Sequence, residues 1–282
     1  MKDSECVLFL QWVLPKLQMR WPGFRRVRKQ VCKRVVRRMR QLDLPDAPAY
    51  RAHLETHPDE WANLDVFCRI TISRFFRDRA VFDLLGREVL PQLAQQAADE
   101  KSRKIRVWSI GCGAGEECYS LTIQWQLLLQ PCFPDCELYI LGTDSDEQQL
   151  ERARAACYPG NSLKEMPFEW KRAAFEERGG RLCLRPGFRT GVELRQQDVR
   201  RELPEGLFHL ILCRNLAFTY FEEALQREIA RAIHEHLAVG GALVIGKHEV
   251  VPAGVANFKE IKAGLGIYIK GHLPGKSLSC FR

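Results

Sequence analysis

The sequence lacks the features that would place it in a membrane or make it a zinc protein. No apolar run reaches the length of a membrane-spanning helix. The apolar run at residues 6–14 is short, follows Lys2 and Asp3, and has no small-residue cleavage site, which favours a helix of the fold over a signal peptide. We therefore expect no membrane span and a cytoplasmic location. The 11 cysteines form no Cys-x-x-Cys pair, so we expect no metal site and reduced, mostly buried thiols.

Acidic residues are missing from residues 20–40, which hold ten Lys and Arg. Apolar residues recur every four positions in this stretch, at Val27, Val31, Val35 and Met39. This spacing predicts a basic amphipathic helix. The net charge of +8 also favours an anionic partner: an acidic protein, nucleic acid or an anionic membrane surface. No Asn/Asp-Pro-Pro-Tyr/Phe segment is present to hold a base, which counts against nucleic acid as the partner. Alternatively, the cations of this helix form the solvated face of a small helical bundle, an interpretation that the sequence supports equally.

Residues 106–117 predict the ligand-binding turn of an α/β domain. An apolar strand leads into Gly111, Gly113 and Gly115, and Glu116 and Glu117 open a helix. Glycines permit a tight turn and a close approach to a ligand. Two carboxylates at this point would repel a pyrophosphate but suit a cation, so S-adenosylmethionine (SAM) is favoured over NAD or ATP. The alternative is an ordinary strand-turn-helix corner whose acids favour the helix dipole.

Acids follow two later strands. Asp144 ends the strand at 138–142, where a carboxylate usually accepts ribose hydroxyls. Asp146 is expected to cap the helix at 147–156. Asp198, after a strand at 192–194, is expected either to meet an adenine amine or to cap a turn.

The rest of the chain fits the same alternation of strands and helices. Residues 158–190 interrupt it with Pro and Gly and predict an inserted subdomain, with small strands at 182–184 and near Phe188. A strand at 207–213 and a helix at 222–237 follow, and we expect the glycines at 240 and 241 to end that helix. Strands at 242–246 and 267–270 are expected to complete the sheet.

With these segments in order, the chain resembles the CheR-type methyltransferases, SAM-dependent enzymes that methylate glutamate side chains of chemotaxis receptors. The matching segments are 73–77, 108–120, 143–146, 213–215 with Tyr220 and Phe221, and Gly240 with Gly241. The resemblance covers roughly residues 20–250. It implies an α/β fold, a doubly wound, Rossmann-like class I methyltransferase sheet at 71–282, with the insertion at 158–190 and a helical N-terminal domain at 1–70.

The resemblance also implies a cofactor, a site and a partner. The cofactor is SAM, and the positions expected to line its site are Thr71, Ser73, Arg77, Gly111, Gly113, Gly115, Glu117, Asp144, Asp198, Val199, Cys213, Arg214 and Asn215. Arg77 and Tyr220 fall where the family places its candidate catalytic side chains. The implied partner is an acidic protein substrate, such as chemoreceptor-like helices.

Two alternatives to glutamate methylation stay open. One is a class I methyltransferase acting on a small molecule or another protein side chain, with residues 158–190 as a lid. The other is a non-catalytic SAM-binding regulatory protein, against which the presence of both Arg77 and Tyr220 counts. The segment Lys247-His248-Glu249 differs from the small-residue-Glu-Asn segment usual in the family.

Overall fold

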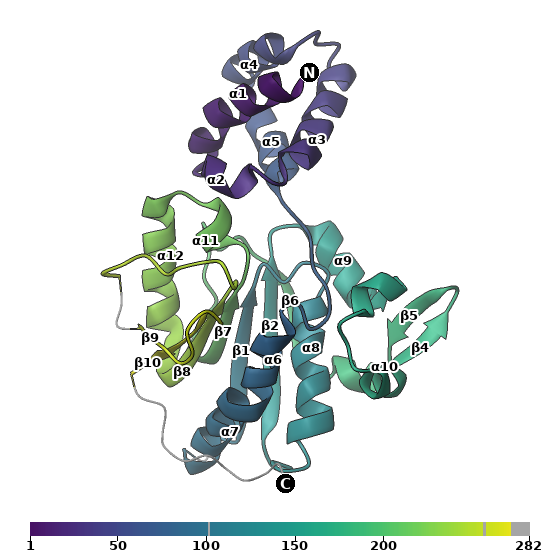
Figure 1. Cartoon of the computed structure of the whole chain (residues 1–282), viewed down its shortest axis with the longest axis vertical. Helices are drawn as coiled ribbons and strands as arrows, with labels where there is room; N and C mark the ends of the chain where they lie inside the picture. The colour runs from purple at the N-terminus through teal and green to yellow at the C-terminus, as the bar shows by residue number, and fades with distance from the viewer. Residues whose placement is uncertain (101, 256–257, 272–282) are drawn as a thin grey trace. The chain divides into compact units, whose positions relative to one another are not determined.

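A computed structural model describes residues 1–100, 102–255 and 258–271 of the chain (Figure 1). The chain forms two compact units. The first holds Met1–Ile72 and Thr219–Gln226, and the second holds the rest. In the described ranges, no helix combines the length and the hydropathy needed to cross a bilayer.

The first unit is helical. Its elements are α1 (Asp3–Val13), the 3-10 turn η1 (Leu14–Leu17), α2 (Trp21–Phe24), α3 (Arg28–Gln41), α4 (Ala47–Thr56) and α5 (Glu60–Cys68). The predicted basic amphipathic helix is α3, which buries Val31, Val35 and Met39. The segment Thr219–Gln226 belongs to this unit through backbone hydrogen bonds. Arg20 N donates to Tyr220 O (2.8 Å), and Glu222 N donates to Gln18 O (2.9 Å).

A buried carboxylate ties three helices of the first unit together. Glu60 accepts hydrogen bonds from Arg38 of α3, Tyr50 of α4 and Asn63 of α5. Burial alone would raise the pKa of Glu60, but these hydrogen bonds outweigh it and lower the pKa to about 2. The cluster therefore contributes to stability while Glu60 is charged.

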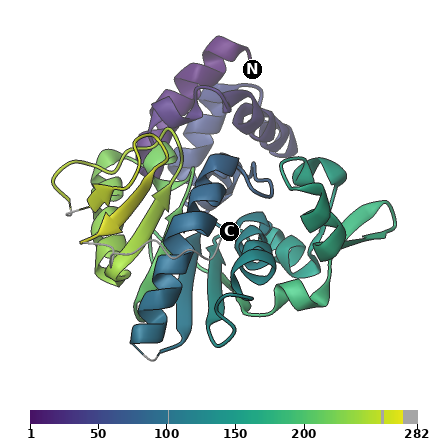
Figure 2. The same ribbon diagram turned by 60° about the horizontal axis from the view of Figure 1, so that its bottom comes forward.

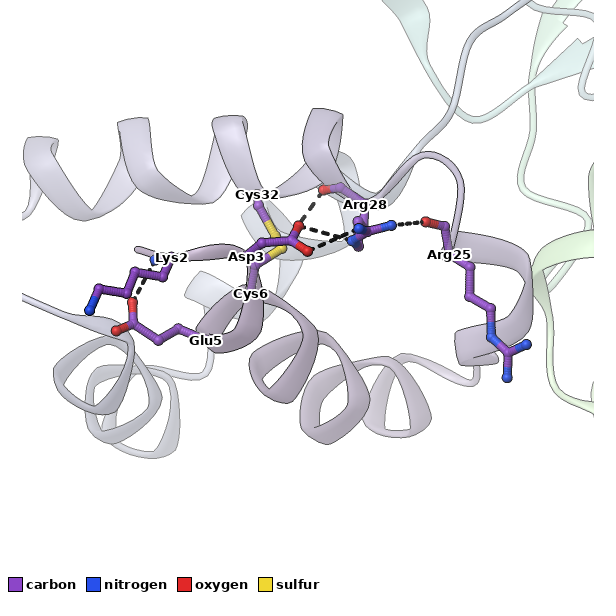
Figure 3. The surroundings of a disulfide bond; sticks show 7 residues. All are labelled: Lys2, Asp3, Glu5, Cys6, Arg25, Arg28 and Cys32. Carbon is purple, nitrogen blue, oxygen red and sulfur yellow. Dashed lines mark hydrogen bonds and ion pairs between the residues drawn. A yellow bond between two sulfur atoms is a disulfide. The ribbon is translucent and has the colours of Figure 1, made fainter.

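Two disulfides correct the expectation of reduced thiols. Cys6 and Cys32 join α1 to α3 (Figure 3), and Cys157 and Cys183 join two strands of the second unit. Each pair is separated by 26 residues. Packing of distant elements, which no local spacing reveals, brings each pair together. The other cysteines in the described ranges form no disulfide.

The second unit is built on a seven-stranded sheet of order β6-β2-β1-β7-β8-β10-β9. The strands are β1 (Lys104–Ile110), β2 (Glu137–Asp144), β6 (Val192–Gln196), β7 (Phe208–Cys213), β8 (Leu237–Ile245), β9 (Phe258–Glu260) and β10 (Ile267–Lys270). The strands from β6 to β8 are parallel, whereas β10 pairs antiparallel with both β8 and β9. The chain runs from β1 outward to β2 and β6 and then returns to β7, so the order reverses beside β1. Open α/β sheets bind their ligands at such a reversal.

Helices cover both faces of this sheet (Figures 1 and 2). They are α6 (Arg79–Leu84), the π-turn η2 (Leu85–Val89), α7 (Leu90–Asp99), α8 (Glu116–Gln124), the π-turn η3 (Trp125–Leu129), α9 (Glu147–Ala155) and α12 (Glu223–His236). The short helix α11 (Ala217–Tyr220) follows β7 in the chain. Alternate residues of β1 serve the two faces: Ile105 and Val107 join the core formed with α6, α7 and α8, while Trp108 lies against Phe208 and His236. The predicted class I methyltransferase fold is confirmed.

A small antiparallel sheet lies within the predicted insertion, in the order β3-β5-β4. Its strands are β3 (Cys157–Tyr158), β4 (Phe175–Arg178) and β5 (Arg181–Leu184), accompanied by η4 (Gly160–Leu163), α10 (Phe168–Ala174) and η5 (Pro186–Arg189). In both views it lies at the side of the unit away from β9 and β10 (Figures 1 and 2). The strand expected near Phe188 is wrong, because that residue lies in the 3-10 turn η5.

The glycines at 240 and 241 do not end a helix. Helix α12 already ends at His236, and β8 begins at Leu237. The pairing of β7 with β8 shifts between Phe208↔Leu237 and Leu210↔Ala242, so both glycines lie in the irregular part of this strand. Gly240 has φ 75°, a conformation that glycine adopts without strain. The two glycines therefore mark an irregularity in β8 and not the end of a helix.

Candidate functional site

The glycine turn after β1 has the backbone conformation that its sequence demands. Gly111, Gly113 and Gly115 have φ values of 71°, 56° and 84°, in the left-handed region that disfavours side chains. A Cβ on Gly111 would clash with the side chain of Leu216, whereas a Cβ on Gly113 would meet nothing within 4 Å. The turn therefore packs tightly against the loop after β7 and is open at its centre. An open centre leaves room for a ligand to approach the backbone.

Asp144 joins the end of β2 to this turn. Its Oδ2 accepts a hydrogen bond from Gly113 N and its Oδ1 accepts one from Asp146 N, each at 2.8 Å. A carboxylate offers about four acceptor positions, which is the property that binding of ribose hydroxyls requires. The expected cap is confirmed, since Asp146 Oδ1 accepts from Gln148 N at 3.0 Å.

The two acids at the start of α8 differ in their contacts and their burial. Glu117 Oε1 accepts from Ser109 Oγ (2.8 Å), and its Oε2 accepts from Arg214 (3.1 Å). Glu116 is 4% exposed, so its carboxyl group is buried at the start of α8. Burial raises the pKa of Glu116. The two carboxylates therefore do not form the cation-facing pair that the sequence indicated, and Glu117 alone is tied to the end of a neighbouring strand.

Arg214 connects three segments of the site. Besides Glu117, its guanidinium donates to Asp78 Oδ2 (2.7 Å) and to the backbone carbonyl of Arg77 (2.9 Å). The side chain of Arg214 is only 4% exposed. A buried guanidinium between two carboxylates organises them in fixed positions. Arg214 thus contributes to the architecture of the predicted site.

The segment before α6 is held in an unusual backbone conformation. Phe76 and Asp78, which flank Arg77, both have left-handed φ values, 53° and 62°. Such residues cost about 1–3 kcal/mol each and persist where neighbours fix them. Phe76 N donates to Ser120 Oγ of α8 (3.0 Å), and Arg214 fixes Asp78. Arg77 is therefore presented from a constrained corner.

The inserted subdomain reaches the glycine turn. The Tyr158 hydroxyl of β3 donates to the backbone carbonyl of Ala114 at 2.7 Å. The ring of Phe75 packs edge-on against Tyr158 and Phe175. The insertion therefore supports both the glycine turn and the corner that carries Arg77.

Asp198 adopts the turn-capping arrangement that the sequence left open. Its carboxylate accepts from the backbone and side chain of Arg200, and its carbonyl accepts from Arg201 N and Glu202 N. Val199 lies in the same turn, which follows Gln197, whose N donates to Asp144 O (3.0 Å). This turn is anchored at Asp144, and a contact of Asp198 or Val199 with adenine stays a prediction.

Two buried cysteines near the site have raised pKa values. A contact with Cys118, together with burial, raises the pKa of Cys112 well above its usual value. Burial also raises the pKa of Cys213, which ends β7. Both thiols therefore stay protonated at neutral pH, and a contact of Cys213 with the cofactor stays a prediction.

Two predicted residues lie in the first unit. Thr71 is exposed near the end of that unit, and Tyr220 packs its ring on Phe24 at 5.0 Å. Hydrogen bonds link Gly113 to Asp144, and Arg214 to Glu117 and to the backbone of Arg77, at the sheet edge where β1, β2 and β7 end. The roles of Thr71 and Tyr220 stay predictions.

Sequence reasoning missed three residues that organise this edge. Ser109 and Asp78 bind the Glu117–Arg214 pair, and Glu249 accepts from Asn215 N. A serine inside an otherwise apolar strand and an acid directly after Arg77 were available signals. Glu249 lies in the segment 247–249, which differs from the segment usual in the family but for which the sequence indicated no role.

The residues fit a cofactor that is cationic at one end and carries a ribose. The turn is open at Gly113, Asp144 can accept hydroxyls, and Glu117 places negative charge beside the turn. Within the described ranges, no group of three or more His, Cys, Asp or Glu side chains is arranged to hold a metal ion. Fold and site together define a class I SAM-dependent methyltransferase domain.

Comparison with known proteins identifies the family. The family described as CheR methyltransferase, SAM binding domain, matches residues 71–267. The chain therefore belongs to the CheR methyltransferase family, and its cofactor is SAM.

Two relatives carry names that agree with this assignment. The chain is 32% identical over 182 residues to a chemotaxis protein methyltransferase of Listeria innocua, a match that covers 64% of this chain and 66% of that protein. It is 28% identical over 252 residues to a probable chemotaxis protein methyltransferase of Rhizobium etli, covering 84% of this chain and 92% of the other. A solved structure of PKMT2 from Rickettsia typhi in complex with AdoHcy is 17% identical, covers 51% of this chain and 21% of that chain, and has a TM-score of 0.32.

Proposed function

We propose that the protein transfers the methyl group of SAM to glutamate carboxylates of an acidic, helical protein, as expected for a chemotaxis-type methyltransferase. The observation that carries the proposal is the assembly at one sheet edge of the glycine turn, Asp144, Glu117 and the corner bearing Arg77. The match to the CheR family covers all four.

The proposed reaction requires little acid–base catalysis from the protein. A glutamate carboxylate is ionised at neutral pH and needs no general base to act as a nucleophile. When bound, SAM supplies a methyl group on a sulfonium, and the carboxylate oxygen takes that methyl to give a methyl ester and S-adenosylhomocysteine. The site must mainly align two reactants and exclude water, which contributes about 7–11 kcal/mol when alignment is good.

Arg77 is the side chain we propose for orienting the acceptor. Its backbone is fixed between two left-handed residues, and its carbonyl is held by Arg214. A guanidinium can hold one carboxylate oxygen while the other attacks. Tyr220 is proposed to act with it, as the resemblance to the family implies.

The first unit supplies a cationic surface suited to an acidic substrate. Exposed cations follow one face of α3 at Lys29, Lys33, Arg37 and Arg40. The other arginines of this helix are used internally: Arg28 pairs with Asp3 (Figure 3), Arg34 donates to two carbonyls, and Arg38 pairs with Glu60. Between α1 and α3 lies a groove of about 650 Å³ with Lys2, Lys29, Lys33, Arg34, Arg37 and Arg40 in its lining. This charge complements the proposed acidic substrate and steers its approach.

Methyl transfer to protein can be tested directly. The chain would be incubated with methyl-labelled SAM and a protein extract of the cells that carry its gene. We expect label that is released as methanol by mild base, which is the behaviour of a carboxyl methyl ester. Arg77→Ala is the matched negative control. Base-stable label would assign another acceptor, and SAM binding without any transfer would favour a regulatory protein.

The cationic face has its own test. Lys33→Glu with Arg37→Glu should raise the KM for the protein acceptor at least tenfold and leave the affinity for SAM unchanged. Lys16→Glu with Arg51→Glu, which changes two cations packed on the ring of Trp12 instead, serves as the charge-matched control. An equal effect of both pairs would show that net charge alone matters.

The cytoplasmic location expected from the sequence stays a prediction. Disulfides are rare in reducing compartments, so the two cysteine pairs count against it. Fractionation of cells with thiol trapping at lysis tests both points together.

A further inference from the structure

We propose that Glu249 is a positioning residue of the SAM site, fixing the backbone at Asn215 and through it the loop that carries Arg214 and Leu216. Glu249 does not belong to the set of side chains expected to line the cofactor. The inference rests on the proposed function only in treating this sheet edge as the place of methyl transfer.

A single oxygen of Glu249 joins the ends of two adjacent strands. Glu249 is 8% exposed and follows β8. Its Oε2 accepts from Gly246 N at 2.6 Å, directly after β8, and from Asn215 N at 2.8 Å, just after β7. The last residues of the two strands, Cys213 and Ile245, are paired in register. The carboxylate therefore links the two segments that follow β7 and β8 at the site.

Asn215 needs such a fastening. Its φ of 56° lies in the left-handed region, which Asn enters at a modest cost and only where neighbours support it. A Cβ at Gly246 would clash with the Asn215 amide group and with the Glu249 carboxylate. Gly246 thus makes the room, and Glu249 supplies the acceptor for the Asn215 N–H.

The two neighbours of Asn215 carry this constraint into the site. On one side, Arg214 holds Glu117 and Asp78. On the other, the side chain of Leu216 covers Gly111, the first glycine of the cofactor turn. A shift at Asn215 would therefore disturb both the acid of α8 and the glycine turn. Glu249 acts on cofactor binding through these residues.

The test compares Glu249→Ala with Glu249→Gln by calorimetric titration with S-adenosylhomocysteine. We expect Ala to weaken binding at least tenfold and Gln to stay within threefold of the parent, because the amide oxygen can still accept both N–H groups. Hydrogen exchange of the peptide 213–217 should accelerate in the Ala variant and not in the Gln variant. The parent's own affinity tests the proposed cofactor site, whereas the ratio of variant to parent tests Glu249.

Glu60→Ala controls for a general loss of stability. Glu60 is also buried and hydrogen-bonded, but it lies outside the region that matches the family. Its loss should lower the thermal midpoint and leave affinity for S-adenosylhomocysteine unchanged. If Glu249→Ala does not fold, Glu249→Asp replaces it: the shortened side chain withdraws the oxygen and should weaken binding at least fivefold. Parent-like affinity in the folded Ala or Asp variant, or an equal loss in Ala and Gln, would overturn the proposal.

Discussion

Replacing Asp144 by Asn should damage the SAM site about as much as replacing it by Ala. Both carboxylate oxygens accept backbone N–H groups, one from Gly113 and one from Asp146. An Asn has one oxygen, so its NH2 group must face one of these two donors. The similar shape of Asn therefore does not preserve the site, because its NH2 group would face a backbone N–H that also donates.

The expected magnitude follows from these hydrogen bonds. A hydrogen bond to a charged group contributes about 1.5–3 kcal/mol, and an unsatisfied buried donor costs a similar amount. Loss of the Gly113 contact with weakened ribose contacts should total about 3 kcal/mol, which is about a 100-fold increase in Kd. The change should appear in binding of both SAM and S-adenosylhomocysteine, since the two share the ribose.

Calorimetric titration of the parent, Asp144→Asn and Asp144→Ala measures this. Asp146→Ala is the matched control: it removes a helix cap, costs about 1 kcal/mol of stability, and should leave the Kd within twofold. If folded Asp144→Asn bound SAM within threefold of the parent, the reasoning from paired donors would be refuted.

Three other substitutions give separate checks. Arg77→Ala should lower kcat at least tenfold while the thermal midpoint holds, because alanine keeps the carbonyl of residue 77 that Arg214 binds; unchanged kcat would make Arg77 structural. The pKa of Glu60 is lowered from 4.5 to about 2, so its contribution is complete above about pH 5 and is lost as the pH falls through 2. Glu60→Gln should therefore unfold in urea with up to about 3 kcal/mol less free energy at pH 7, and the difference should shrink toward pH 2, whereas a pH-independent difference would contradict this cause. Serine at both Cys6 and Cys32 should lower the free energy of unfolding by about 3 kcal/mol, since the bond closes a loop of 26-residue separation, and equal stability with and without reductant in the parent would speak against the bond in solution.

The sequence predicted what depends on local pattern. Apolar runs and glycines placed the parallel strands and the turn after β1, and Asp146 was correctly expected to cap α9. The order of motifs sufficed for the fold class and the family, because a strand–turn–helix corner followed by acid-ended strands builds one kind of sheet.

Contacts between distant residues were not predictable in this way. Arg214 reaches Glu117 across 97 residues of chain, and Glu249 reaches Asn215 across 34. Glu116 and Glu117 were expected to face a cationic ligand together. Consecutive residues of a helix point in different directions, so Glu116 is buried and Glu117 reaches Arg214. The disulfides were missed for the same reason, since only packing shows which cysteines meet.

The segment Thr219–Gln226 has a consequence for how the protein can be divided. It lies between β7 and β8 in the chain, yet its backbone partners are Gln18 and Arg20, and its Tyr220 ring rests on Phe24. A fragment starting at residue 73 would keep the glycine turn and Asp144 but leave the Glu222 N–H and the Tyr220 carbonyl without these partners. The tyrosine proposed for catalysis is thus held by the helices that precede the cofactor domain, and isolating that domain would release it.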